Sequence, residues 1–127
     1  MSDKKIIITE NAPAPIGPYN QAVKTGNLLF ISGQIALVPG TDMLSDASIA
    51  AETEQVMKNL KAILTAEGLG FAAVVKTTIF LSSMEHFAEV NKIYGSYFTG
   101  NYPARETVAV KGLPRNVNVE ISMIASF

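Results

Sequence analysis

The stretch "SIAAETEQVMKNLKAILTAE" (Ser48–Glu67) decides how the rest of this chain can fold. Its apolar side chains recur every three or four residues, which is the periodicity of a helix with one buried face. Gly68 follows directly and is typical of a residue that ends a helix. The side chains expected on the buried face are Ile49, Thr53, Val56, Met57, Leu60, Ile63 and Leu64.

Segments typical of β-strands lie on both sides of this helix. They are short, rich in β-branched residues and bounded by turn-forming residues. Between the second and third strands, Gly26-Asn27 tolerates positive φ and predicts a tight hairpin. The loop "NAPAPIGPYN" contains several prolines, which restrict its backbone and predict an ordered connection. The expected strands are Lys5–Thr9, Gln21–Thr25, Leu28–Ile35, Val74–Leu81, Glu106–Lys111 and Val117–Ser126.

A second helix is expected over Ser83–Phe98. Ser82 and Glu85 have the spacing of a capping box at its start. Its apolar stripe consists of Phe87, Val90, Tyr94, Tyr97 and Phe98. The order of elements predicts an α+β fold, in which two helices cover one face of a mixed sheet. We expect residues 1–127 to form a single domain, because the length suits one hydrophobic core.

Composition excludes several classes of function. Lys and Arg number 10 against 11 Asp and Glu, so no strong global charge favours nucleic acid or an anionic membrane. Cysteine is absent and His86 is the only histidine, so the sequence predicts no thiol chemistry and no metal site. We find neither a signal-peptide pattern nor a membrane span, and expect a soluble, cytoplasmic protein. Only 17% of the residues are charged and 48% are hydrophobic, which favours an oligomer.

Two polar residues interrupt apolar patterns. Glu120 lies in the middle of the last strand, on the face that alternates with the apolar one, among small neutral residues. It is either a glutamate facing solvent or an acid–base group in a cleft between subunits. Asn91 interrupts the stripe of the second helix between Phe87 and Tyr94, so its amide meets either water or a polar pocket.

Three further residues are candidates because of their local setting. Arg105 follows Pro103 at the start of a strand, and it forms either a surface ion pair or a bidentate grip on a carboxylate. Tyr19 sits on the proline-rich loop, where it covers the edge of the core or closes a small site. Gly33 interrupts an apolar strand, which indicates a bulge or a close approach of another group.

The chain resembles the RidA (YjgF) family of reactive enamine/imine deaminases along essentially its whole length. The resemblance rests on "NAPAPIGPYNQAV", "ISGQI", "VKTTIFL", "FAEVNKIY", "YPARETVAV" and "GLPRNVNVEI", in this order and at fitting separations. It implies a chorismate-mutase-like fold assembled as a homotrimer, with sites in the clefts between subunits. The face of the sheet opposite the helices would then be buried against the other chains.

The resemblance also implies roles for individual residues. Arg105 would anchor the substrate carboxylate, Glu120 would hold and activate a water, and Tyr19 would close the site from across the subunit interface. The remaining substrate-binding positions would be Ser32, Gly33, Asn91 and Thr107. Thr107 stands where many family members have cysteine, so any thiol role is lost while the main-chain N–H and C=O remain.

The implied activity is that of a 2-iminobutanoate/2-iminopropanoate deaminase that needs no cofactor. It would hydrolyse reactive 2-enamino and 2-imino acids, such as 2-aminoacrylate released by serine or threonine dehydratases, to 2-keto acids and ammonia. Two alternatives stay open: an endoribonuclease or translation inhibitor acting on single-stranded RNA, and a non-catalytic regulatory protein that binds 2-keto acids. The near-neutral charge disfavours the RNA alternative.

Overall fold

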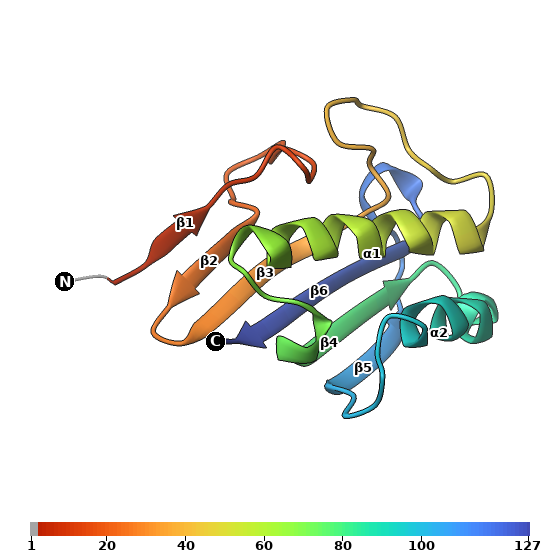
Figure 1. The fold of residues 1–127 in the computed structure, drawn as a ribbon. Helices are drawn as coiled ribbons and strands as arrows, with labels where there is room; N and C mark the ends of the chain where they lie inside the picture. Colours follow the sequence, from red (N-terminus) through yellow and green to blue (C-terminus); the bar gives the residue numbers. More distant parts are fainter. Residues whose placement is uncertain (1–2) are drawn as a thin grey trace.

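The computed structural model describes residues 3–127 and contains a six-stranded sheet with the strand order β1-β2-β3-β6-β4-β5 (Figure 1). Its elements are β1 (Lys5–Ile7), β2 (Ala22–Thr25), β3 (Leu28–Gln34), α1 (Ile49–Ala66), β4 (Val74–Leu81), α2 (Phe87–Gly95), β5 (Ala104–Ala109) and β6 (Val119–Ser126). Short 3₁₀ turns occupy Phe71–Ala73, Met84–His86 and Pro114–Asn116.

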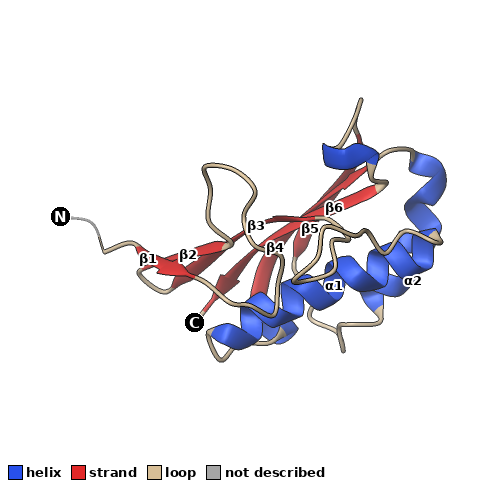
Figure 2. Cartoon of the chain, turned by 90° about the horizontal axis from the view of Figure 1, so that it is seen from above, coloured by secondary structure: helices blue, strands red, loops and turns tan. Residues whose placement is uncertain are grey.

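The sheet is mixed, because β4 and β5 run parallel while every other neighbouring pair is antiparallel. Both helices lie on the same face of this sheet, as the view from above shows (Figure 2). The predicted arrangement of two helices on one face of a mixed sheet is therefore confirmed.

The core lies between α1 and the central strands. Met57, Leu60 and Leu64 of α1 are fully buried, as are Val119 and Ile121 of β6. Alternate residues of β6 point into this core, as the strand's period of two predicts. The other face of the sheet is not covered by α1 or α2, and Phe30 and Val108 are among its exposed apolar side chains.

The second helix begins differently from the prediction. The side chain of Ser83, rather than that of Ser82, accepts a hydrogen bond from the Glu85 N–H and caps the 3₁₀ turn. Ser82 is used elsewhere: its hydroxyl donates to Asn118 Oδ1 over 2.7 Å. The regular helix ends at Gly95, so the predicted end at Phe98 is three residues too far along the chain.

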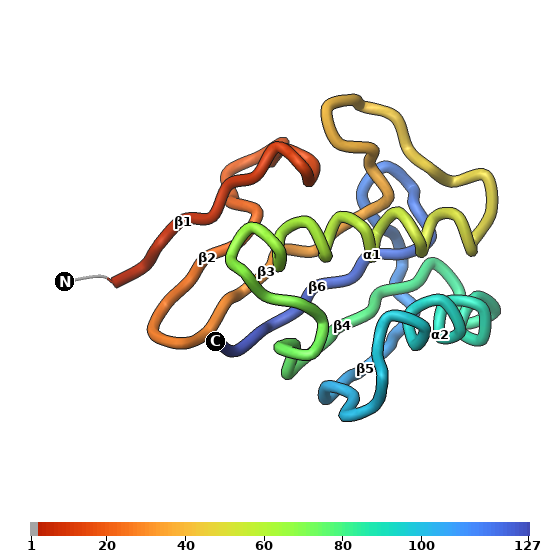
Figure 3. The backbone as a smooth tube through the Cα atoms, viewed as in Figure 1, coloured from red at the N-terminus to blue at the C-terminus, as the bar shows by residue number. Residues whose placement is uncertain are grey.

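Strand ends also shift by a few residues. β5 starts at Ala104, so Arg105 is its second residue and is held by the sheet rather than standing before it. β1 ends at Ile7 instead of Thr9, and β6 starts at Val119 instead of Val117. A long connection joins β3 to α1 above the sheet (Figure 3). Within residues 3–127, neither helix combines the length and the apolar character that crossing a membrane requires.

Candidate active site

Glu120 lies on the open face of the sheet and packs directly against Gly33 of the neighbouring strand. A Cβ atom added to Gly33 would come within 2.9 Å of the Glu120 carboxyl carbon, and closer still to Oε2. The pairing of β3 with β6 also shifts register between Ile31 and Gln34. Gly33 therefore combines both features that a glycine in a strand can indicate, the bulge and the close approach.

Burial raises the pKa of the Glu120 carboxyl above its ordinary value. The cause is desolvation, which disfavours the charged form of the carboxyl. A half-buried carboxylate of this kind is a better proton acceptor than an exposed one. Its setting differs from that of a glutamate that simply faces solvent.

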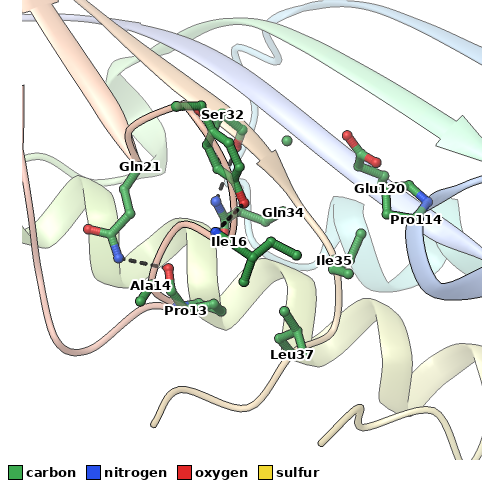
Figure 4. A pocket seen from close by; sticks show the side chains of 12 residues that line it. Pro13, Ala14, Ile16, Gln21, Ser32, Gln34, Ile35, Leu37, Pro114 and Glu120 are labelled. Carbon is green, nitrogen blue, oxygen red and sulfur yellow. Dashed lines mark hydrogen bonds between the residues drawn. The ribbon is translucent and has the colours of Figure 1, made fainter. Parts of the chain in front are cut away.

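Glu120 borders a pocket of about 370 Å³. The figure shows Glu120 and Pro114 on one side of this pocket and Gln21 with Pro13 on the other (Figure 4). The rest of its wall is mainly apolar, and its backbone comes from the proline-rich loop, the end of β3 and the turn before β6. Its other lining residues are Ala14, Ile16, Tyr19, Ser32, Gly33, Gln34, Ile35 and Leu37.

Buried amides fix two walls of this pocket. The Gln21 amide donates to the carbonyl oxygens of Thr9, Ala12 and Pro13 and so holds the proline-rich loop in place. The Asn59 amide of α1 donates to the Ile35 and Leu37 carbonyls, at 3.1 and 2.9 Å, and fixes the opposite wall. The shape of the pocket is therefore set by the core beneath it.

Two of the predicted site residues line this pocket with hydroxyl groups. The Tyr19 ring is half exposed, and its hydroxyl accepts a hydrogen bond from the Ile16 N–H over 3.3 Å. The Ser32 hydroxyl donates to the Asn20 carbonyl oxygen, so its own proton is already used. Tyr19, Ser32, Gly33 and Glu120 thus lie around one pocket.

Arg105 borders a second pocket, of about 330 Å³, between β5 and α2. Its Nη1 donates to Asn91 Oδ1 over 2.7 Å. The guanidinium carbon also lies 5.3 Å from the centre of the Tyr94 ring and 5.8 Å from that of Phe87. Because Phe87, Asn91 and Tyr94 follow one another along one side of α2, this helix orients the guanidinium.

The Asn91 bond is the only hydrogen bond of the Arg105 guanidinium within residues 3–127. An arginine has five N–H donors in a planar fork, so four donors of Arg105 remain for solvent or a ligand. A carboxylate accepts two such donors side by side. The second pocket is therefore suited to bind a carboxylate.

Tyr94, whose ring contacts the Arg105 guanidinium, is itself fixed by a hydrogen bond to the sheet. Its hydroxyl donates to Thr77 Oγ1 over 2.9 Å in the interior. Burial raises the pKa of the Tyr94 phenol, although the Thr77 bond and the Arg105 charge act in the opposite direction. The phenol therefore stays protonated, and its ring position beneath the guanidinium is fixed.

Thr107 lies two residues after Arg105 on the same face of β5. Its Oγ1 is buried and has no hydrogen-bond partner in the part of the chain that the structure describes. A buried hydroxyl without a partner is costly, so this group is available to a ligand or a water. The side chain thus adds a polar group to the main-chain N–H and C=O that the resemblance implies for this position.

The two pockets lie on opposite faces of the sheet. Arg105 pairs with Thr77, whose side chain is fully buried beneath the helices. Glu120 pairs with Phe80, and side chains alternate along β4, so Phe80 and Thr77 face opposite sides. One small molecule therefore cannot touch Arg105 and Glu120 of the same chain.

The two pockets contain few ionisable side chains. Within residues 3–127, no group of three or more His, Asp or Glu side chains could hold an ion. The polar groups that remain are the guanidinium, one carboxylate of raised pKa and several hydroxyl and amide groups. Such a set can hold a carboxylate and move a proton.

Sequence reasoning missed most of the apolar wall. Ile35, Leu37 and Pro114 line the first pocket because β3 and the turn before β6 come together there, which no local pattern reveals. It also missed the aromatic support of Arg105. The spacing of Phe87, Asn91 and Tyr94 by four and three residues was the available signal for a shared helix face.

Comparison with known proteins identifies the family. The family described as Endoribonuclease L-PSP matches residues 9–127. The chain is 47% identical over 122 residues to a mouse protein named 2-iminobutanoate/2-iminopropanoate deaminase, with 96% of this chain and 90% of the relative covered. The chain belongs to the RidA (YjgF) family.

Solved structures of RidA-family proteins agree with this fold. The Rid family protein YyfA from Yersinia pestis superposes with a TM-score of 0.94 at 44% identity, covering 98% of this chain and 99% of its own. TdcF from E. coli, solved with bound serine, gives a TM-score of 0.92 at 38% identity, covering 97% and 98%. The chorismate-mutase-like fold implied by the resemblance is therefore confirmed, and the RidA family as a whole includes deaminases of imines.

Proposed function

We propose that this protein hydrolyses 2-imino acids to 2-keto acids and ammonia, in a site formed between two subunits of a homotrimer. The observation that supports the proposal best is Glu120, a carboxylate of raised pKa packed against Gly33 at a largely apolar pocket. A RidA-family relative from mouse is named for this reaction.

The two half-sites require a second chain to come together. Arg105 and Glu120 face opposite sides of one sheet, yet the reaction needs a carboxylate anchor and a base around one small substrate. The open face of the sheet exposes apolar side chains such as Phe30 and Val108, which a neighbouring chain would cover. In the proposed trimer, Arg105 of one subunit therefore serves the pocket of the next.

The reaction follows from the groups present. Arg105 holds the substrate carboxylate, and the imine carbon faces a water bound by Glu120. Water attacks the carbon of the protonated imine while Glu120 takes one of the water's protons, giving a neutral carbinolamine. Glu120 returns this proton to the nitrogen and then accepts the carbinolamine hydroxyl proton as the C–N bond breaks, so that ammonia and the 2-keto acid leave. The departing ammonia takes the last proton from Glu120 and restores the carboxylate. General acid–base help of this kind contributes about 10²–10⁴-fold.

The preferred substrates are the small imines that form when 2-aminoacrylate and its relatives tautomerise, and the volume of the pocket leaves room for a short apolar side chain. Tyr19 and Ile16, on the loop at the pocket's rim, would close over the bound imine. Because such imines are short-lived, we place the protein with the dehydratases that release them, in the cytoplasm.

Turnover is the decisive test. A serine or threonine dehydratase generates the enamine in place, and loss of imine and release of ammonia are followed with and without this protein. We expect clear acceleration, which Arg105→Ala abolishes. Arg105→Lys restores only part of it, because an ammonium cannot reproduce the planar fork. Glu120→Gln binds a 2-keto acid almost normally but turns over slowly, and Tyr19→Phe has a milder effect than either.

The site between subunits has its own test. Arg105→Ala and Glu120→Gln chains are co-expressed and compared with each variant alone. If each site takes Arg105 from one chain and Glu120 from another, random mixing gives about a quarter of the sites both native residues, so activity reappears. Activity that never reappears, or a fully active monomer in sedimentation, would reject the shared site.

The two alternatives predict different results. A regulatory protein that only binds 2-keto acids would show Arg105-dependent binding without any acceleration. An endoribonuclease would cleave single-stranded RNA with a strong dependence on salt. We expect no cleavage above that of the Arg105→Ala variant, because the chain has 10 basic against 11 acidic residues.

A further inference from the structure

Glu52, in the first turn of α1, is the only charged side chain that is buried among residues 3–127, and it is fully buried. It lies outside both pockets and touches none of the groups assigned above to the reaction. A buried carboxylate is costly unless hydrogen bonds compensate for the lost water. Its partners therefore indicate what it does.

The carboxylate of Glu52 binds the start of β6. Its Oε2 accepts from the backbone N–H groups of Asn118, at 2.7 Å, and Val119, at 2.9 Å. Its Oε1 accepts from the Asn118 side-chain amide at 3.1 Å. Together, the two carboxylate oxygens hold Asn118 and Val119 at the start of β6.

Asn118 is held from the other side as well. The Ser82 N–H donates to the Asn118 carbonyl at 3.0 Å, and the Ser82 hydroxyl donates to Asn118 Oδ1 at 2.7 Å. Ser82 directly follows β4. Glu52 and Ser82 therefore clamp Asn118 between the start of α1 and the end of β4, through both its backbone and its side chain.

This clamp lies between two parts of the first pocket. Glu120 follows Val119 directly, and Pro114 opens the 3₁₀ turn that precedes Val117. In that turn Arg115 and Asn116 both have positive φ, of 57° and 55°, a conformation that is uncommon for residues other than glycine. A turn with this backbone needs to be held by its surroundings. The bonds of Glu52 hold the segment immediately after it.

We propose that Glu52 is a positioning residue for the reaction. Through its bonds to Asn118 and Val119, it fixes the positions of Glu120 and Pro114 in the wall of the first pocket. The inference rests on the proposed function. Glu52 touches no substrate and acts only through the strand entrance. Since Arg105 lies on another strand, Glu52 affects the base and leaves the carboxylate anchor unchanged.

The test compares Glu52→Ala, Glu52→Gln and Thr53→Ala with the wild-type chain. Thr53 is the matched control, because it is adjacent, fully buried and polar, yet its hydroxyl donates only to Ile49 of its own helix. Imine turnover and binding of 2-ketobutyrate are measured per folded site, well below each melting temperature.

We expect kcat to fall about 10- to 100-fold in Glu52→Ala, because a base displaced by about 1 Å loses its alignment. The dissociation constant for 2-ketobutyrate should change less than about threefold, since Arg105 dominates carboxylate binding. Glu52→Gln should recover much of the loss, because its oxygen still accepts N–H bonds. Thr53→Ala should keep the native kcat even where it lowers the melting temperature.

A purely structural role would give a different pattern. Native kcat in the folded fraction of both Glu52 variants would overturn the inference, as would equal losses in kcat and in ketobutyrate affinity. If Glu52→Ala does not fold, the same criteria apply to Asn118→Ala, which removes the side chain that Glu52 and Ser82 both bind. If the wild-type chain itself fails to accelerate imine loss, the proposed function fails first, whatever the variants do.

Discussion

Substituting Gly33 by alanine should separate activity from stability. The new Cβ would lie 2.9 Å from the Glu120 carboxyl carbon, against at least 3.4 Å for an ordinary contact. That carbon must retreat by about half an ångström and the nearer carboxylate oxygen by more than about 1 Å, and a misplacement of about 1 Å can reduce the rate about 100-fold.

Stability should change little, because the displaced group is the mobile end of a half-buried side chain. Gly33 does not have a positive φ, so alanine can adopt its backbone conformation. Replacing glycine within a strand also reduces the entropy of the unfolded chain, which offsets part of the steric cost by about 0.5–1 kcal/mol. We expect the free energy of unfolding to stay within about 1 kcal/mol of the native value.

The assay follows imine hydrolysis and thermal unfolding for Gly33→Ala and for Gly70→Ala. Gly70 is the matched control, because an added Cβ there meets nothing within 4 Å and its φ is −132°. Gly70→Ala should retain native turnover. A folded Gly33→Ala variant with native kcat would show that the placement of Glu120 against Gly33 does not matter for the reaction.

Four further outcomes are expected. Because burial raises the pKa of Glu120 and its ionised form is the base, kcat should fall with decreasing pH through a value above 4.5; an acid limb at or below 4.5 would contradict this. The same shift makes ionisation of Glu120 unfavourable for folding, so Glu120→Gln should raise the melting temperature at neutral pH, and the difference should vanish below the ordinary pKa. Asn91→Ala should weaken 2-keto acid binding about 3- to 10-fold in calorimetry, since Arg105 loses its 2.7 Å acceptor, and unchanged affinity would show that the aromatic rings alone orient it. Asn59→Ala should lower the free energy of unfolding by about 2–3 kcal/mol in urea titration, because the Ile35 and Leu37 carbonyls lose their donor; a change below about 0.5 kcal/mol would imply that water replaces it.

Sequence periodicity alone determined the layers of the fold. The apolar spacing of α1 and the alternation in β6 each follow from one local rule, because side-chain direction depends on the backbone period of 3.6 or 2. These rules also placed Glu120 on the face of β6 that points away from the core. Element ends were less certain, as the shift of the cap from Ser82 to Ser83 shows, since neighbouring serines compete for the same role.

Only the tertiary structure decided how the chemical groups meet. Asn91 could have faced water, and it binds Arg105 because α2 packs beside β5. Gly33 and Glu120 are far apart in the sequence and adjacent only because β3 pairs with β6. Glu52 was not among the side chains expected on the buried face of α1, and its partners at Asn118 and Val119 depend on how α1 crosses the sheet. Contacts between distant segments depend on strand order and packing, which local propensity does not encode.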